Sequence, residues 1–397
     1  MNILGLAFRN IKASKFRSIA IFLCVMGVAA FLLSTTLIIK GAEYSLDAGI
    51  SRLGADILVV PSGAEQKVET ALLMGKPTSV WMPQENLARL AAIPGVEKVS
   101  PQIYLASLYG ASCCAVSEMF MVVYDPQTDF AITPWLQRKL GRGLRLGEVI
   151  GGTYIFVPEG DKDIKLYGYH LTLKGNLEAT GIGIDQTMFM TLETAREMAK
   201  ASVINAEKPL VIPDDSISAV LVKVKPGEDV HKVALTILEK TLGMVPIESP
   251  NLFGAFRNQM KGLLWGFLAI TVIVWALALV LMGLVFSMAA NERRREIAVL
   301  KALGASRRFI FSSILTEAAF LAITGAFLGI SLAGFGLYIF KDYIAGSLKM
   351  PFLFPSLAAF FGMFGGGIAI ALLTVTLAAL YPALMISRQE AAITMRE

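Results

Sequence analysis

Four long apolar runs without any charged side chain dominate the hydrophobic pattern of the chain. They are Ser18–Ile39, Gly262–Ala290, Ala318–Phe340 and Met350–Ser387. A helix needs about 20 apolar residues to cross a bilayer, and each run is long enough. Soluble proteins bury helices too, but such helices rarely lack charge over so many residues. The pattern therefore predicts four transmembrane helices, at 18–39, 262–290, 309–340 and 357–383.

The stretch between the first two apolar runs, 40–261, is patterned like a folded domain with short strands and helices. Strands are predicted at Asp56–Pro61, after Gly95, at Tyr169–Leu173, Ala179–Ile184, Met188–Met190, Ser218–Val224 and Met244–Ser249. Helices are predicted at Pro83–Ala92, at Thr191–Ala201 with Thr191 as N-cap, and between Pro226 and Gly243 with Val230, Val233, Ile237 and Leu238 inward.

Two β–α–β units at the ends of this stretch indicate an α+β domain with a duplicated half. The flanking residues, Lys40–Ala55 and Asn251–Gly262, are poor in the Gly, Ser and Pro of flexible linkers. They are expected to prolong the first two membrane helices as stalks. The predicted fold class is an α-helical membrane protein with four transmembrane helices and a large α+β extracytoplasmic domain inserted between helices 1 and 2.

Composition and charge agree with a membrane protein and assign its orientation. Hydrophobic residues make up 55% of the chain and charged residues 17%, against about 25% charged in soluble domains. The segment before the first run has four basic residues and no acid, and 291–308 has six basic against two acidic, whereas 40–261 has 22 basic and 25 acidic. Because basic loops stay in the cytoplasm, both termini are predicted to be cytoplasmic. Nothing suggests nucleic-acid binding.

The expected topology divides the chain into nine segments. They are a cytoplasmic amphipathic helix (1–17), helix 1 (18–39), the extracytoplasmic domain with its stalks (40–261), helix 2 (262–290), a cytoplasmic connection (291–308), helix 3 (309–340), a second extracytoplasmic loop (341–356), helix 4 (357–383) and a cytoplasmic tail (384–397).

Candidate catalytic chemistry is sparse. The chain has only two histidines, His170 and His231, in different predicted elements, and no G-x-x-x-x-G-K-[ST] loop for nucleotide binding. We therefore predict that the chain is not an enzyme and holds no cofactor. Glu317 is the one charged residue well inside a predicted transmembrane helix, 309–340; it either makes a structural hydrogen bond or marks a functional position.

Cys113 and Cys114 are adjacent and are followed by Met119 and Met121. Three interpretations stay open. The thiols can be buried small residues of a strand, a redox pair on an oxidising side of the membrane, or, with the two thioethers, a soft-metal site. No metal site is assigned with confidence.

The connection 291–308 is a charged, helix-prone stretch between two apolar runs. Ile297, Leu300 and Leu303 fall near one helical face, Gly304 is expected to end the helix, and Ser306 to cap the next one. A cytoplasmic hairpin explains the positive charge but not an apolar stripe, which would be left exposed unless a partner protein covers it.

The chain resembles, over nearly its whole length, the FtsX/MacB/LolC-LolE family of ABC transporter permeases. The residues that carry the resemblance are NERRREIAVLKALGASRRFIFSSILTEAAFLAITGAFLGISLAG, the N-terminal MNILGLAFRNIKASKFRSIAIFL, the domain segments RLGADILVVPSGA and VVYDPQTDFAITPWL, and the tail YPALMISRQEAAITMRE. The tail departs from the family pattern at Ala391–Met395, where the family carries Pro and Glu-Ala-Leu.

The resemblance implies a permease subunit in the bacterial inner membrane. A separate cytoplasmic ATPase would bind ATP and dock on the connection, and its motion would be transmitted mechanically to a MacB-like periplasmic domain, driving export or extraction of a substrate. The alternative is an FtsX-like signal relay that controls a periplasmic partner enzyme. The docking residues expected from this resemblance are Glu292, Arg293, Glu296, Lys301, Gly304 and Arg307.

Two pairs of small residues predict close helix packing in the membrane. Gly325 and Gly329, and likewise Gly362 and Gly366, are spaced four residues apart, which lets helix backbones approach each other. These pairs either join the chain to a second copy or a paralogue, or pack helices within one subunit. Membrane lipids are the remaining expected partners.

Overall fold

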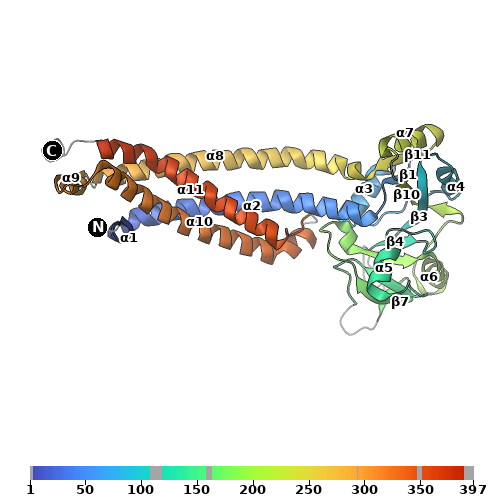
Figure 1. Ribbon diagram of the computed structural model, residues 1–397. Helices are drawn as coiled ribbons and strands as arrows, with labels where there is room; N and C mark the ends of the chain where they lie inside the picture. The colour runs from blue at the N-terminus through green and yellow to red at the C-terminus, as the bar shows by residue number, and fades with distance from the viewer. Residues whose placement is uncertain (1–2, 108–118, 158–162, 293, 347–350, 389–397) are drawn as a thin grey trace. The chain divides into compact units, whose positions relative to one another are not determined.

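The computed structural model describes residues 3–107, 119–157, 163–292, 294–346 and 351–388 (Figure 1). The chain divides into two compact units. A helical unit contains Met1–Lys40, Met260–Lys341 and Phe354–Glu397, and an α/β unit contains Gly41–Gln259 and Asp342–Leu353. The chain therefore passes from one unit to the other four times.

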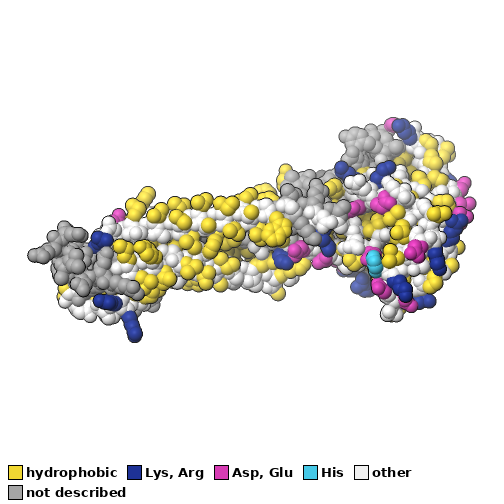
Figure 2. All heavy atoms as spheres, turned by 90° about the horizontal axis from the view of Figure 1, so that it is seen from above, with side chains coloured by type: hydrophobic (Ala, Val, Ile, Leu, Met, Phe, Trp, Pro, Cys, Tyr) yellow, Lys and Arg dark blue, Asp and Glu magenta, His cyan; other side chains and the backbone are white. Residues whose placement is uncertain are grey.

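Helices of the helical unit follow the apolar runs. They are α1 (Ile3–Ala13), α2 (Lys15–Leu53), α8 (Gly254–Glu292), α9 (Arg294–Ala302), α10 (Arg307–Gly346) and α11 (Leu357–Arg388). Four of them, α2, α8, α10 and α11, are long and apolar enough to cross a membrane. Figure 2 shows hydrophobic side chains along the visible face of this unit, while most charged side chains lie on the α/β unit. Most of the predicted stalk residues are helical, because α2 runs on to Leu53 and α8 already begins at Gly254.

The core of the helical unit is built from small and branched side chains at helical spacing. Every fourth residue of α2 is buried, at Ile21, Val25, Ala29, Leu33 and Leu37. This stripe packs with alanines of α10 and α11 and with Met282 and Phe286 of α8. A four-residue spacing keeps side chains on one face of a helix, so α2 presents a continuous ridge to its neighbours.

The α/β unit contains a nine-stranded sheet in the order β11-β1-β10-β3-β4-β8-β5-β7-β6. Its strands are β1 (Ile57–Pro61), β3 (Val96–Ala106), β4 (Phe120–Tyr124), β5 (Glu148–Gly151), β6 (Ile164–Leu166), β7 (Tyr169–Asn176), β8 (Thr187–Thr191), β10 (Ala219–Val224) and β11 (Met244–Glu248). A separate small sheet pairs β2 (Met82–Pro83) with β9 (Ser216–Ile217). The helices are α3 (Glu65–Met74), α4 (Asn86–Ala91), α5 (Thr133–Leu140), α6 (Leu192–Asn205) and α7 (Val230–Lys240).

The predicted duplication is visible in one half of the sheet. The units β1–α4–β3 and β10–α7–β11 each place a helix between two strands, and their four strands interleave in the order β11-β1-β10-β3 with antiparallel pairing. This is the split β–α–β arrangement. The other half, β4 to β8, lies in the sequence between the two units.

Alternating residues of the strands face opposite sides of the sheet. Leu58 and Leu221 belong to a core shared with α3 and α5, whereas Ile57 and Val222 face α4 and α7. Met121 and Met190 face α6 in a third core. The sheet is therefore covered on both faces at its centre, which explains why β1, β4, β8 and β10 are nearly continuous apolar runs.

Most predicted strands and helices of this unit are confirmed, and three details are wrong. The helix predicted over Pro83–Ala92 begins only at Asn86, because Pro83 belongs to strand β2. Residues Ala179–Ile184 form no strand; instead a 3₁₀-helix spans Gly183–Gln186. The buried Asp185 carboxylate accepts hydrogen bonds from the backbone N–H groups of Thr180 and Gly181 and bends this loop. Leu238 is 51% exposed, because the buried stripe of α7 runs through Val233, Ala234 and Ile237.

The His231 imidazole should titrate above the ordinary histidine pKa. Its Nδ1 lies 2.6 Å from Oε1 of Glu248 on β11, and this carboxylate raises the pKa of His231. The pair therefore stabilises the fold fully below pH ~6.5, the unfolded histidine pKa. That contribution is lost as pH rises through the folded pKa. NMR titration of the two labelled histidines in the full chain measures this, and Glu248→Gln should return the His231 pKa toward ~6.5. An unshifted His231 in the unaltered chain would contradict the contact.

Candidate functional site at the α8–α10 connection

The connection between α8 and α10 is a short helix with well-defined ends. The helix α9 stops at Ala302, and Gly304 follows with φ of 93°. The N–H of Ala305 donates to the carbonyl of Leu300 at 2.9 Å, the bond that closes a helix when glycine adopts a left-handed conformation. The Ser306 hydroxyl accepts from the N–H of Phe309 at 3.2 Å and caps α10. Both predicted helix-end roles, of Gly304 and Ser306, are confirmed.

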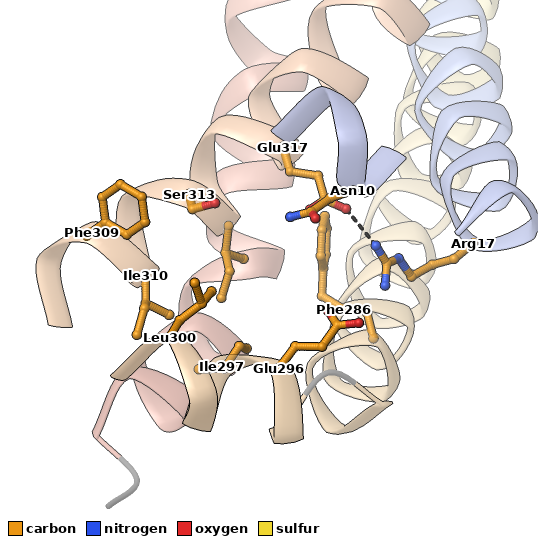
Figure 3. Close-up of a pocket in the computed structure, with 12 residues that line it drawn as sticks. Asn10, Arg17, Phe286, Glu296, Ile297, Leu300, Phe309, Ile310, Ser313 and Glu317 are labelled. Atoms are coloured by element: carbon orange, nitrogen blue, oxygen red, sulfur yellow. Dashed lines mark hydrogen bonds and ion pairs between the residues drawn. The ribbon is translucent and has the colours of Figure 1, made fainter. Parts of the chain in front are cut away.

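A pocket of about 110 Å³ lies where α9 meets four other helices. Figure 3 shows α9 supplying Glu296, Ile297 and Leu300 to one side, and Arg17 of α2 and Glu317 of α10 on the other. The remaining lining residues come from α1, α8 and α10 and are Asn10, Phe286, Ala289, Phe309, Ile310, Ser313 and Ile314. α1, α9 and the last turns of α11 lie at the same end of the helical unit (Figure 1).

One ion pair joins two of these helices across 300 positions of sequence. Arg17 Nη2 donates to Oε1 of Glu317 at 2.6 Å, and the two side chains are only 10% and 8% exposed. A carboxylate at this depth is stabilised by the guanidinium, since unpaired buried charge is strongly disfavoured. The arrangement favours the structural interpretation of Glu317.

The expected docking residues occupy different positions around α9. Glu292, Glu296, Gly304 and Arg307 are exposed. Arg293 lies outside the described residues, and nothing is described of the Lys301 side chain. Of this set, only Glu296 lines the pocket.

The apolar stripe of α9 requires a correction. Ile297 and Leu300 are partly covered by the chain itself, because they face Phe309 and Ile310 across the pocket, and Ala298 is buried. Val299 and Leu303 remain 51% and 79% exposed. A partner protein is therefore not needed to cover the whole stripe, and the apolar surface left for one is the Val299–Leu303 side.

The two glycine pairs differ in surroundings. A Cβ added at Gly329 would lie 2.2 Å from the Met26 carbonyl oxygen, and one at Gly325 would lie 3.0 Å from the Phe22 carbonyl oxygen. This pair therefore packs α10 against α2 within one subunit. Nothing lies within 4 Å of a Cβ added at Gly362 or Gly366, so this face of α11 is open in the single chain.

The sulfur-containing residues give no assembled site. Cys113 and Cys114 lie outside the described residues. Met119 and Met121 are 4% and 0% exposed in the core that α6 covers, together with Met188, Met190 and Met198. Within the described part of the chain, no group of three or more His, Cys, Asp or Glu side chains could hold a metal ion.

Comparison with known proteins identifies the membrane part of the chain. Residues 268–391 match the family described as FtsX-like permease C-terminal. This range contains α9, its closing turn, and α10 with Glu317 and the packed glycine pair. The part of the helical unit from within α8 to the end of α11 is therefore an FtsX-like permease domain.

Similar proteins extend this class to most of the chain. The chain is 24% identical over 380 residues to an uncharacterized ABC transporter permease, YvrN, of Bacillus subtilis, covering 88% of this chain and 89% of the relative. It is 22% identical over 374 residues to an uncharacterized ABC transporter permease of Mycobacterium tuberculosis, covering 90% and 93%. The chain is thus a homologue of ABC transporter permeases, a class that implies an ATPase partner in general.

Solved structures are similar to part of the chain, and one of them is a MacB fragment. The periplasmic region of MacB from Actinobacillus actinomycetemcomitans aligns over 53% of this chain and 96% of that one, with 10% identity and a TM-score of 0.32.

The sequence alone did not predict that Arg17 pairs with Glu317, or that five helices line a common pocket. Arg17 was counted only among the basic residues that orient the first helix. Its position directly before an uncharged run was a signal, because an arginine there can reach a neighbouring helix as well as the membrane surface.

Proposed function

We propose that this chain is the permease subunit of an ABC transporter, and that a separate cytoplasmic ATPase docks on α9. ATP would be bound in that partner, since the sequence has no P-loop of its own. Closure of the ATPase would displace α9, and α8 and α10 would carry the displacement to the α/β unit. Work on a substrate, its export or extraction, would then be done by the α/β unit on the other side of the membrane.

The geometry of α9 is the observation that supports this proposal most strongly. It is a short helix joined to α8 on one side and, through a four-residue turn, to α10 on the other. The acidic Glu296 and the apolar Val299 are exposed on it, and Leu303 and the basic Arg307 are exposed just after it. A mixed surface of this kind suits a protein partner better than lipid, because charged groups at a buried contact must be paired.

The proposed orientation places α9 and both termini in the cytoplasm and the α/β unit in the periplasm. It is supported by the six basic residues of 291–308 and the four that precede the first apolar run. The position of α1, α9 and the end of α11 at one end of the helical unit (Figure 1) is consistent with this assignment. The inner membrane of a bacterium is the proposed location.

A second permease copy, or a paralogue, is the proposed neighbour of α11. Gly362 and Gly366 are open in the single chain, and small residues allow another helix to approach closely in the membrane. The outer face of α8 is also exposed, for example at Trp265, Ile273 and Leu284, where lipid or the second copy would cover it.

Charge reversal on α9 tests the docking proposal. The substitution Glu296→Lys replaces an exposed acid on the proposed contact and should lower recovery of a co-expressed ABC ATPase about tenfold, which corresponds to ~1.4 kcal/mol. Gly304→Pro should abolish recovery, because proline cannot adopt the positive φ of this turn. Binding is measured by co-purification in lipid nanodiscs, and coupling by ATP hydrolysis of the complex.

The matched control is Glu239→Lys, which makes the same charge change on an exposed position of α7. It should leave ATPase recovery unchanged. If Glu296→Lys and Gly304→Pro both retain full binding and full hydrolysis, α9 is not the docking element.

A further inference from the structure

We infer that Phe352, in the connection between α10 and α11, is a positioning residue that fastens this connection to the α/β unit. The inference rests on the proposed function, because it names the route by which α10 and α11 would move that unit. We call this attachment the Phe352 clasp. It consists of Phe352 and Leu353, the Gly181 loop (Leu177–Gln186), and the part of α2 around Gly41 and Ser45, where the helix enters the α/β unit.

The clasp is made by backbone hydrogen bonds on both sides. Phe352 N–H donates to the carbonyl of Gly181 at 3.1 Å, and Leu353 N–H donates to the carbonyl of Gly41 at 3.1 Å. Phe352 itself is only 4% exposed. Two consecutive residues therefore join a loop of the sheet to α2, and the aromatic ring is buried between them.

Two glycines make room for this contact. A Cβ at Gly41 would lie 2.6 Å from the Phe352 ring. A Cβ at Gly181 would lie 2.3 Å from the Phe352 carbonyl oxygen and 2.7 Å from the Ser45 hydroxyl, and Gly181 has φ of 75°. At Gly181 the backbones approach so closely that a side chain would force them apart, whereas at Gly41 a side chain would collide with the Phe352 ring.

The Gly181 loop is rigidly attached to the sheet. Asp185, 1% exposed, accepts from the N–H and hydroxyl of Thr180 at 2.9 and 2.8 Å and from Gly181 N–H at 2.6 Å. Ile182 and Ile184 are buried in the core beneath the sheet, and β8 begins at Thr187. A displacement of Phe352 would therefore move the Gly181 loop and, with it, the start of β8.

A second contact holds the other end of the same segment. The Tyr154 hydroxyl donates to Asp342 Oδ1 at 3.2 Å, and the Tyr154 N–H donates to the Asp185 carbonyl at 2.9 Å. The segment Asp342–Leu353 is thus tied at both ends to the half of the sheet that contains β5 and β8. By contrast, α2 leads into β1, and α8 follows β11, both in the other half.

Through the segment Asp342–Leu353, α10 and α11 are connected to the α/β unit, as α2 and α8 are through β1 and β11. A shift of α10 and α11 driven through α9 would pull on the β5–β8 half through the Phe352 clasp. The clasp stays closed while it transmits this motion.

Hydrogen exchange of the full chain in nanodiscs, alone and with its ATPase, tests the inference. In the chain alone, Phe352→Ala should speed amide exchange in Leu177–Gln186 at least tenfold. The control Phe354→Ala removes a neighbouring ring that contacts Tyr338 and Phe360 instead, and it should leave this loop unchanged. Equal exchange in Phe352→Ala and the unaltered chain overturns the clasp, without any reference to the ATPase.

An engineered cysteine pair distinguishes loss of the clasp from general misfolding of the Phe352→Ala chain. In a background with the three native cysteines changed to serine, Gly41→Cys with Leu353→Cys should form a reversible disulfide that restores slow exchange to Phe352→Ala. In the ATPase complex, ATP should alter exchange in β8 of the unaltered chain, and Phe352→Ala should reduce that change at least threefold while ATPase binding persists. An undiminished change overturns the transmission role. If the unaltered chain binds no ATPase, the proposed function is contradicted. The clasp is still tested in that case by amide exchange of the chain alone.

Discussion

Replacing Gly329 by leucine should lower the thermal stability of the helical unit severely. A Cβ at this position would lie 2.2 Å from the Met26 carbonyl oxygen and 2.9 Å from its carbon. Backbone atoms cannot move aside as a flexible side chain can, so α10 would have to separate from α2. Forced overpacking costs about 1–3 kcal/mol and occasionally more. We expect at least the upper figure here, a drop in Tm of roughly 6–12 °C.

The matched controls are Gly362→Leu and Gly366→Leu on α11. Nothing lies within 4 Å of an added Cβ there, and leucine favours a helix by up to ~1 kcal/mol over glycine. The Tm of the single subunit should be unchanged or slightly higher, while association with a second copy should weaken. Thermal unfolding and mass photometry in nanodiscs measure the two effects. A Tm for Gly329→Leu equal to that of the unaltered chain would refute the packing of α10 on α2.

Removing either partner of the Arg17–Glu317 ion pair should destabilise the helical unit by about 3–5 kcal/mol. The cause is the charge left behind, since both side chains are about nine-tenths buried. Arg17→Met leaves a carboxylate without its guanidinium, and Glu317→Leu leaves a guanidinium without its carboxylate. Glu317→Gln should cost less, because the amide oxygen can still accept a hydrogen bond.

The double variant Arg17→Met/Glu317→Leu distinguishes the energy of the ion pair itself from the other effects of each substitution. It should recover most of the lost stability, because two apolar side chains of suitable size often replace a buried ion pair at little cost. Unfolding of the four proteins in lipid, read as a double-mutant cycle, gives the coupling. Single variants within about 1 kcal/mol of the unaltered chain would show that the pair does not hold α2 to α10.

The elements that the sequence predicted well are those with a local cause. Uncharged runs indicated the four long helices, and Gly304 and Ser306 marked the turn after α9 because their conformations depend on neighbouring residues only. Strands β1, β10 and β11 were recognisable as apolar runs between turn residues. The interleaving of the two β–α–β units depends on sheet pairing between distant segments, and only the repeat itself was visible.

The contacts that escaped prediction join residues far apart in sequence. Arg17 and Glu317 are separated by 300 positions, and Phe352 meets Gly181 and Gly41 from a different part of the chain. Gly329 and Gly366 looked equivalent by spacing, yet one faces a neighbouring backbone and the other does not. Spacing places a residue on a face of its helix, but the neighbour that meets this face is decided by tertiary packing.

The pairing of β1 with β11 has a consequence for how such a chain could arise or be rebuilt. Ile57 lies opposite Glu248, and Pro61 opposite Met244, so the first and last strands of the α/β unit are adjacent and antiparallel. A module whose ends are neighbours can be inserted into a helical protein without spreading the two helices that flank it, as domain insertions in general require. The unit could therefore be exchanged as a cassette between permeases. The 342–353 segment lies outside that cassette, and the recipient protein would have to supply its equivalent.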